Sequence, residues 1–199
     1  MLSITRSFVS LSTASFDSSH DAQHAEDVYQ HSIRIAECDG HTLDPNFDSD
    51  ILMLAAQLHD VVDVKYKDTC ITREGLLEFI ESQVGPCKAS RVMAIIDSVS
   101  YRKQVMGERK DLGSDNIYLH IVSDADKIEA IGLLGVERCR AYTVAKNPLF
   151  SKVEVQAGVI EHCHEKLLKL YAEHFIVTPT GRLIAAPLHQ EMVDYVRTH

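Results

Sequence analysis

The sequence predicts an all-α fold: a single domain built as a helical bundle of roughly seven helices. Two observations lead to this prediction. Apolar residues recur at helical spacing in most segments, and no segment shows the apolar–polar alternation typical of a half-buried strand. The 199 residues suit one good-sized domain. We expect residues 1–18 to form an N-terminal extension and residues 19–199 to form the bundle.

The first two predicted helices are the ones that matter most for function. One covers residues 20–38, where the apolar positions form a stripe. A polar loop rich in Asp, Pro and Gly follows. Asp50 is then the expected N-cap of a helix over residues 51–62. This second helix is apolar nearly all round, so we expect it at the centre of the bundle.

Capping and breaking residues divide the rest of the chain. Thr72 is expected to cap a third helix that Gly85 and Pro86 end, and Gly132 and Gly135 are expected to interrupt a long later helix. Helices are expected over 73–84, 88–101 and 115–142, with a charged loop over 102–114 between the last two. A helical segment is expected over 151–174, followed by a turn over 178–182. A short last helix is expected over 187–198, with Pro187 at its start.

Charge and cysteine content narrow the functional classes. The net charge of −9 disfavours binding to a nucleic-acid polymer, which needs a basic surface. No apolar run approaches the roughly 20 residues that span a bilayer, so no membrane association is expected. The five cysteines are an odd number without a C-x-x-C pair. This usage indicates a reducing intracellular compartment such as the cytoplasm.

Imidazole and carboxylate groups are expected on the inward faces of three separate helices. His24 shares the apolar stripe of the first helix, and His59 and Asp60 end the second. The long helix carries two further aspartates in the segment "SDADKIEAIG". Histidine nitrogen and carboxylate oxygen form the ligand set for zinc, manganese or iron. Neighbouring side chains on a helix point about 100° apart, yet one metal ion at a helix end can be reached by both.

This ordered pattern resembles the HD-domain superfamily of metal-dependent phosphohydrolases. The matching segments are "HDAQHAEDV", "LHDVVD" and "DADKIEAIG", and the likeness extends over nearly the whole chain. The segments "SVSY", "HEKLLKL" and "TPTGRLIA" are similar to a branch of small stand-alone HD hydrolases. The resemblance implies an HD-type helical bundle over residues 19–199. It also implies a divalent metal ion (Mn, Fe, Zn, Co or Mg) bound by His24, His59, Asp60 and one further aspartate.

Two aspartates compete for the last ligand position. In superfamily members that hydrolyse the stringent-response nucleotide, the ligand stands in an A-D-R-L context, which Ala125 to Ile128 match best. We therefore assign Asp126 as the ligand. Asp124 is assigned to catalysis, either beside the ligands or in contact with the substrate.

The resemblance implies hydrolysis of a phosphoester, and a bound metal ion would activate the attacking water. Asp63 is the candidate general base, and Lys65 and Lys127 are the candidate phosphate-binding residues. The expected substrate is a small phosphate compound, in particular a nucleotide, and the favoured reaction converts a nucleoside triphosphate to the monophosphate and pyrophosphate. The alternatives are a phosphomonoesterase or phosphodiesterase at the same site, or a metal-stabilised nucleotide-binding module without catalysis.

Other interpretations of the same residues stay open at this point. A lone histidine on an apolar face, as His24 would be, is commonly a hydrogen-bonded core residue. Asp63 and Lys65 could form an exposed ion pair of little energetic value. His31 shares the helix face of His24 and could lie at the site, in the core or in solvent. Arg109 stands in a loop that is either solvated or a mobile lid. The base, the sugar and the oligomeric state are not predicted.

Overall fold

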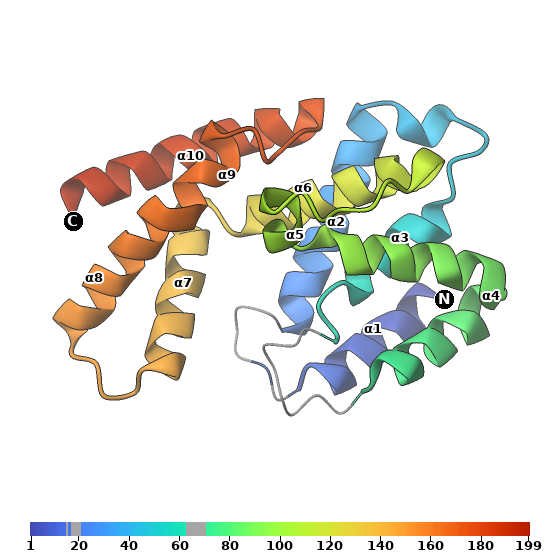
Figure 1. Cartoon of the computed structure of the whole chain (residues 1–199), viewed down its shortest axis with the longest axis horizontal. Helices are drawn as coiled ribbons and strands as arrows, with labels where there is room; N and C mark the ends of the chain where they lie inside the picture. The colour runs from blue at the N-terminus through green and yellow to red at the C-terminus, as the bar shows by residue number, and fades with distance from the viewer. Residues whose placement is uncertain (15, 17–20, 63–70) are drawn as a thin grey trace.

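The computed structural model describes residues 1–14, 16, 21–62 and 71–199, and these ranges contain helices but no strand (Figure 1). The helical elements are α1 (Leu2–Ser12), α2 (Ala22–Cys38), η1 (His41–Leu43), α3 (Ser49–Leu58), α4 (Arg73–Val99), α5 (Tyr101–Val105), η2 (Gly113–Asp115), α6 (Asn116–Glu129), α7 (Gly132–Lys146), α8 (Lys152–His162), η3 (Cys163–Leu167), α9 (Leu168–Ala172) and α10 (Pro179–Thr198). The prediction of an all-α bundle is confirmed. None of the described helices is both long and apolar enough to cross a membrane.

Helix α3 lies at the centre of the bundle, as its apolar sequence predicted. Every residue from Ile51 to Leu58 is buried, and α1, α2, α4 and α6 pack around it. The expected N-cap was wrong by two residues. Asp48 caps the helix, because its carboxylate accepts a hydrogen bond from the backbone N–H of Asp50 at 3.1 Å. The helix therefore starts at Ser49, earlier than predicted.

The boundaries of α4 follow the predicted signals. The Thr72 side chain accepts a hydrogen bond from the backbone of Gly75, which confirms the expected cap. Gly85 adopts a positive φ of 77°, so the helix is broken there and resumes at Pro86. The segment after α4 differs from the prediction of a charged loop over 102–114. Residues Tyr101–Val105 form the short helix α5, and the loop starts only after it.

A second group of helices lies to the left of the central ones in Figure 1, where α7 and α8 form a hairpin below α9 and α10. The chain enters this group through Gly132, which has a positive φ of 76° and begins α7. A Cβ atom there would lie 3.0 Å from the side chain of Leu188 on α10, so glycine suits the position for two reasons. The predicted interruption at Gly132 is confirmed, whereas the one predicted at Gly135 was wrong, because Gly135 is buried inside the continuous helix α7.

The C-terminal segment is one helix rather than a turn followed by a short helix. Thr178 is the N-cap and accepts a hydrogen bond from the backbone N–H of Gly181, while Pro179 occupies the first helical position. The predicted turn over 178–182 was therefore wrong, because these residues form the start of α10. Pro187 was expected to begin a helix, but it lies inside α10, where it removes one backbone donor without ending the helix.

Candidate metal centre

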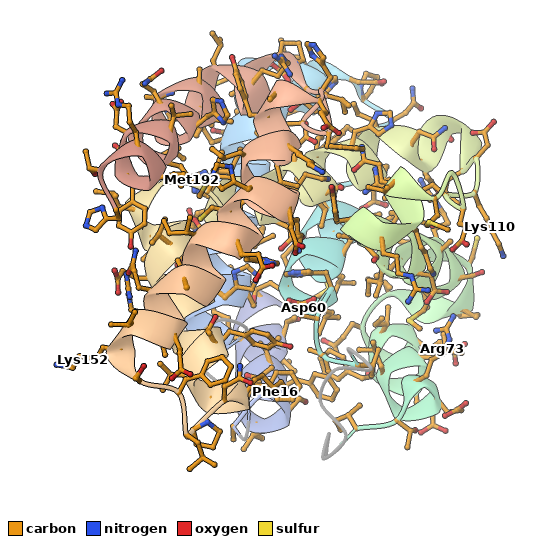
Figure 2. The ribbon with its side chains drawn as sticks, turned by 60° about the vertical axis from the view of Figure 1, so that its left-hand side comes forward. Phe16, Asp60, Arg73, Lys110, Lys152 and Met192 are labelled. Carbon is orange, nitrogen blue, oxygen red and sulfur yellow. The ribbon has the colours of Figure 1, made fainter. Side chains whose placement is uncertain are left out.

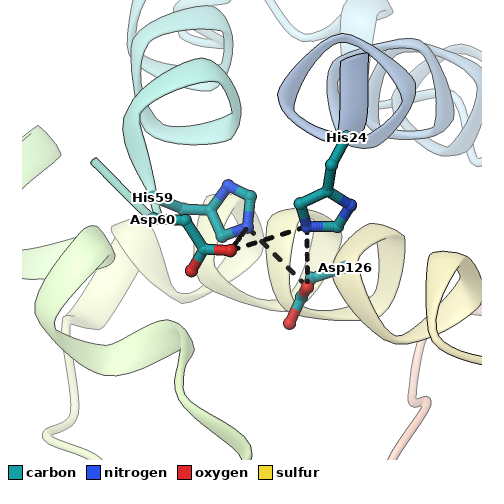
Figure 3. Close-up of side chains that lie close together, drawn as sticks. All are labelled: His24, His59, Asp60 and Asp126. Carbon is teal, nitrogen blue, oxygen red and sulfur yellow. Dashed lines mark ion pairs between the residues drawn. The ribbon is translucent and has the colours of Figure 1, made fainter. Parts of the chain in front are cut away.

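Four side chains from three helices meet at one point in the interior (Figure 3). His24, His59, Asp60 and Asp126 each offer one ligand atom, and these atoms all lie within 4.8 Å of one another. Nε2 of His24 is 3.6 Å from Asp60 and 3.5 Å from Asp126. Nε2 of His59 is 3.3 Å and 3.7 Å from the same two carboxylates. The cluster has the donor set and the dimensions to hold a divalent metal ion.

Helix ends and caps bring these side chains together. His24 stands in the first turn of α2, where Asp21 accepts hydrogen bonds from the backbone N–H groups of Gln23 and His24. His59 is the C-cap of α3, directly after its last residue Leu58, and Asp60 follows as the chain leaves the helix. Asp126 comes from the adjacent helix α6. Figure 2 shows Asp60 in the middle of the molecule, away from the residues labelled at its edges.

His59 is oriented as a metal ligand before any ion binds. Its Nδ1–H donates to the backbone carbonyl of Ala56 at 2.9 Å, so Nε2 is the ring nitrogen that faces the two carboxylates. That Nε2 atom is buried and makes no hydrogen bond with the residues that the structure describes. A buried polar atom without a partner is costly, and a metal ion would satisfy it. The site therefore fits a metal on its own geometry.

The two carboxylates and two imidazoles also adjust one another's protonation. Burial opposes a charge on His59, but Asp60 and Asp126 outweigh it and raise the pKa of His59 well above its usual value. Burial likewise opposes the charge on Asp126, yet the nearby imidazoles of His24 and His59 hold its pKa well below the usual range. Asp126 thus remains a carboxylate, which favours a cation at the centre of the cluster.

Asp124 lies two residues before Asp126 on α6, and its carboxylate faces the start of α10. Its Oδ2 atom accepts hydrogen bonds from the backbone N–H groups of Val177 at 2.9 Å and Thr178 at 2.6 Å. Burial raises the pKa of Asp124, although these hydrogen bonds oppose the shift. The contacts of Asp124 thus anchor α10 against α6. Its assignment to catalysis stays a prediction.

Lys127 and Arg109 form a cationic pair beside the cluster. Both side chains donate to Ser123 Oγ, and Lys127 also donates to the Ser123 carbonyl at 2.9 Å. Lys127 is only 2 % exposed. Burial lowers the pKa of Lys127 to about 8, and the Arg109 charge adds to this effect. Arg109 also donates to the carbonyl of Val99 at 2.7 Å, so it is a packed residue and not a solvated one.

A third cation approaches from the second group of helices. Residues Cys163–Leu167 form η3, a π-helical turn inserted between α8 and α9. Such insertions are often found at functional sites because they redirect a side chain. Lys166 in this turn lies over the ring of Tyr101, with its Nζ 5.3 Å from the ring centroid. Its charge also contributes to the lowered pKa of Lys127.

Two predicted site residues, Asp63 and Lys65, lie outside the described residues. Their roles as general base and phosphate-binding residue stay predictions. The sequence interpretation missed two others, Glu129 and Arg138, which form a layer behind His24. Glu129 binds His31 at 3.0 Å and Arg138 at 2.7 Å. Glu129 could have been found from its place three residues after Asp126 on one helix, whereas Arg138 carried no such signal.

Comparison with known proteins identifies the family. No family model matches the chain. The uncharacterized protein YpgQ of Bacillus subtilis is 30 % identical over 182 residues, which cover 90 % of this chain and 82 % of YpgQ. The chain belongs to the YpgQ family. Protein L803 of Acanthamoeba polyphaga mimivirus is 23 % identical over 218 residues, covering 89 % of this chain and 86 % of L803.

Solved structures of YpgQ and other bacterial proteins share the fold of this family member. The crystal structure of Bacillus subtilis YpgQ in complex with ADP matches with a TM-score of 0.75 and 27 % identity, covering 100 % of this chain and 95 % of YpgQ. An HD-superfamily hydrolase from Bacillus thuringiensis matches with a TM-score of 0.70 and 24 % identity, covering 99 % and 93 %. The HD-type helical fold expected from the resemblance is therefore confirmed.

Proposed function

We propose that this protein is a divalent-metal-dependent phosphohydrolase that acts on a nucleotide or a similar small phosphoester. The observation that carries the proposal is the preset geometry of the cluster. His59 commits Nδ1 to Ala56 and leaves Nε2 buried and without a hydrogen bond, within reach of the carboxylates of Asp60 and Asp126. Together with His24 these residues form the proposed ligand set.

The charges around the cluster support a phosphate-bearing substrate. Arg109 and Lys127 meet at Ser123, and Lys166 adds a third positive charge from η3. Lys127 is buried and its described hydrogen bonds go to the neutral oxygens of Ser123, so a phosphate group would add a charge-assisted hydrogen bond. Lys127 and the undescribed Lys65 are the proposed phosphate-binding residues, and Arg109 and Lys166 extend this set.

A nucleotide is the favoured class of substrate. YpgQ, the family member compared above, was crystallised in complex with ADP. Within this class we favour cleavage of a nucleoside triphosphate to the monophosphate and pyrophosphate. A triphosphate presents several negative charges in a row, which suits several cations near one metal centre.

Phosphoryl transfer needs mainly the positioning of the reacting groups and the neutralisation of charge. When bound, a divalent ion supplies a Lewis acid for a phosphoryl oxygen and an activated water at neutral pH. Asp63 is proposed to take the proton from the attacking water. Lys127, Arg109 and Lys166 neutralise the charge that develops on the phosphoryl oxygens. Asp124 is proposed to support catalysis by fixing the start of α10, whose backbone N–H groups it binds, beside these groups.

Metal analysis followed by product analysis tests the proposal. The purified protein is loaded with Mn²⁺ and given each nucleoside triphosphate, and the products are separated by ion-exchange chromatography. We expect monophosphate and pyrophosphate as the first products. Orthophosphate and diphosphate as first products would reject the favoured reaction. Bound metal without turnover of any phosphoester would instead indicate a binding module.

A matched pair of variants ties the activity to the cluster. His59→Ala removes the preset ligand, so it is expected to lose metal and hydrolysis together. His41→Ala changes a histidine on η1, outside the cluster, and is expected to retain both. Full metal occupancy in the His59 variant would contradict the ligand assignment.

A further inference from the structure

Arg138 connects α7 to the back of the candidate metal centre. Its side chain is 15 % exposed and lies between α2 and α6. One guanidinium nitrogen, Nη1, is 2.7 Å from Glu129 Oε2 and 2.9 Å from His24 Nδ1. The other, Nη2, donates to Asp27 Oδ2 at 3.3 Å. The guanidinium is thus held by two carboxylates while it touches the rear nitrogen of a proposed metal ligand.

The contact between Arg138 and His24 has only one possible direction. A guanidinium carries five N–H donors and no acceptor, so Nδ1 of His24 must accept the hydrogen bond. A neutral imidazole that accepts at Nδ1 carries its proton on Nε2. That Nε2 atom is the one that faces Asp60 and Asp126, at 3.6 Å and 3.5 Å.

His59 has the opposite arrangement, and the contrast within one cluster is informative. Nδ1 of His59 donates to the Ala56 carbonyl, which leaves Nε2 ready for a metal ion. Ligand histidines usually donate their other ring N–H to an oxygen acceptor in this way. His24 has a cation where that acceptor would stand. One histidine of the pair is therefore preset for metal and the other is not.

We propose that Arg138 is a positioning residue that opposes metal binding at His24, and that metal enters only when Arg138 releases Nδ1. A His24 bound to metal through Nε2 carries its proton on Nδ1, and Arg138 cannot accept it. Glu129 and Asp27 retain the guanidinium after the release, because both already pair with it. The inference rests on the proposed metal site and adds a residue that sets its affinity.

The coupling reaches beyond the site, since Arg138 belongs to α7. Helix α7 packs against α8 and α10, two other members of the second group of helices. A movement of the Arg138 side chain changes two side-chain hydrogen bonds that join α7 to α2, those to His24 and Asp27. Metal occupancy is therefore linked to how firmly the second group is held against the first.

Three variants test the proposal by calorimetric titration of the metal-free protein with Zn²⁺. Arg138→Gln offers an amide oxygen that can accept from Nδ1, so we expect zinc affinity to rise by about tenfold or more. Arg138→Lys retains a cation that only donates, so its affinity is expected to stay close to that of the wild type. Arg140→Gln removes a charge two residues along the same helix, where Arg140 pairs with Tyr195 and Glu137, and is expected to leave the affinity unchanged.

The position of the His24 proton separates this role from simple charge repulsion. In ¹⁵N-detected NMR of the metal-free wild type, we expect the proton on Nε2 of His24 and on Nδ1 of His59. In the metal-free Arg138→Gln variant, we expect the His24 proton to move to Nδ1. A change in affinity without this movement would reduce Arg138 to an electrostatic effect and overturn the proposal.

The wild-type spectrum keeps the test decisive even where the glutamine variant fails to fold. A proton on Nδ1 of His24 in the metal-free wild type would overturn the proposal, because Arg138 could not then donate to that atom. Weaker or equal zinc affinity in Arg138→Gln would overturn it as well. A wild type that binds no metal would reject the proposed function itself, whereas equal affinities with bound zinc would reject this inference alone.

Discussion

Replacing Lys127 with methionine should stabilise the fold while it impairs substrate binding. Lys127 is buried, and its burial lowers its pKa from 10.5 to about 8. Its described hydrogen bonds go to the oxygens of Ser123, and the neighbouring Arg109 repels its charge. A positive charge is therefore kept in the interior at a free-energy cost, as is common where a group is needed for function.

The sign and size of this cost follow from the two pKa values. Between pH 8 and 10.5 the unfolded chain binds more protons at this lysine than the folded protein does, so stability rises with pH in that window. Below pH 8 the full penalty applies, and it amounts to about 3 kcal/mol. At pH 9.5 roughly 1 kcal/mol of it remains. The stability advantage of Lys127→Met should therefore shrink by about 2 kcal/mol between pH 7 and pH 9.5.

Urea denaturation of the wild type and Lys127→Met at pH 7, 8, 9 and 9.5 measures this difference. Comparing the two proteins cancels the tyrosines and cysteines that titrate in the same range. The variant should also show a raised KM, because a proposed phosphate contact is lost. A difference in unfolding free energy that is constant across this pH range would refute the reasoning, since Lys127 would then titrate at its ordinary pKa in the folded protein.

Asp126→Ala should lose bound metal in elemental analysis, and full occupancy would show that the wrong acid was assigned. Asp124→Ala should retain the metal but lower the unfolding free energy by about 1–3 kcal/mol, because the buried backbone donor of Thr178 and the partly buried one of Val177 lose their acceptor; unchanged stability in urea would argue against the anchor. Asp63→Asn should retain the metal and lose about 10²- to 10⁴-fold in rate, and an unchanged rate would exclude it as the general base. Gly132→Ala should cost about 2 kcal/mol or more, clearly above Gly107→Ala, which has a positive φ but open space around it; equal thermal shifts would contradict the packing argument.

Local sequence signals predicted the helices well wherever a single physical cause sets the boundary. Thr72 caps α4 with its own side chain, and Gly85 and Gly132 supply the positive φ that ends a helix. The signals failed where two causes compete. Pro187 reads as a helix start, but Thr178 and Pro179 had already started α10 two turns earlier, and the existing helix accepted the second proline.

The proposed metal ligands could be selected from the sequence because each stands at a point where a polar residue breaks an apolar pattern. His59 and Asp60 directly follow the buried stretch of α3 from Ile51 to Leu58, where the packing of the core alone would favour apolar residues. Asp126 and Asp124 could not be told apart in this way, since both interrupt the same apolar helix. Their surroundings differ because Thr178, more than fifty residues further along the chain, donates its backbone N–H to the carboxylate of Asp124.

The contact of Arg138 with His24 could not be predicted from the sequence for a related reason. Its distance from His24 is 114 residues, and the contact depends on the direction in which α7 leaves Gly132. A helix starting one residue later would turn Arg138 by about 100° and present a different side chain to α2. The proposed ligands of this site are thus encoded locally, by helix ends and polarity. The groups behind them, which we propose decide when a metal can bind, are encoded by the packing of one half of the bundle against the other.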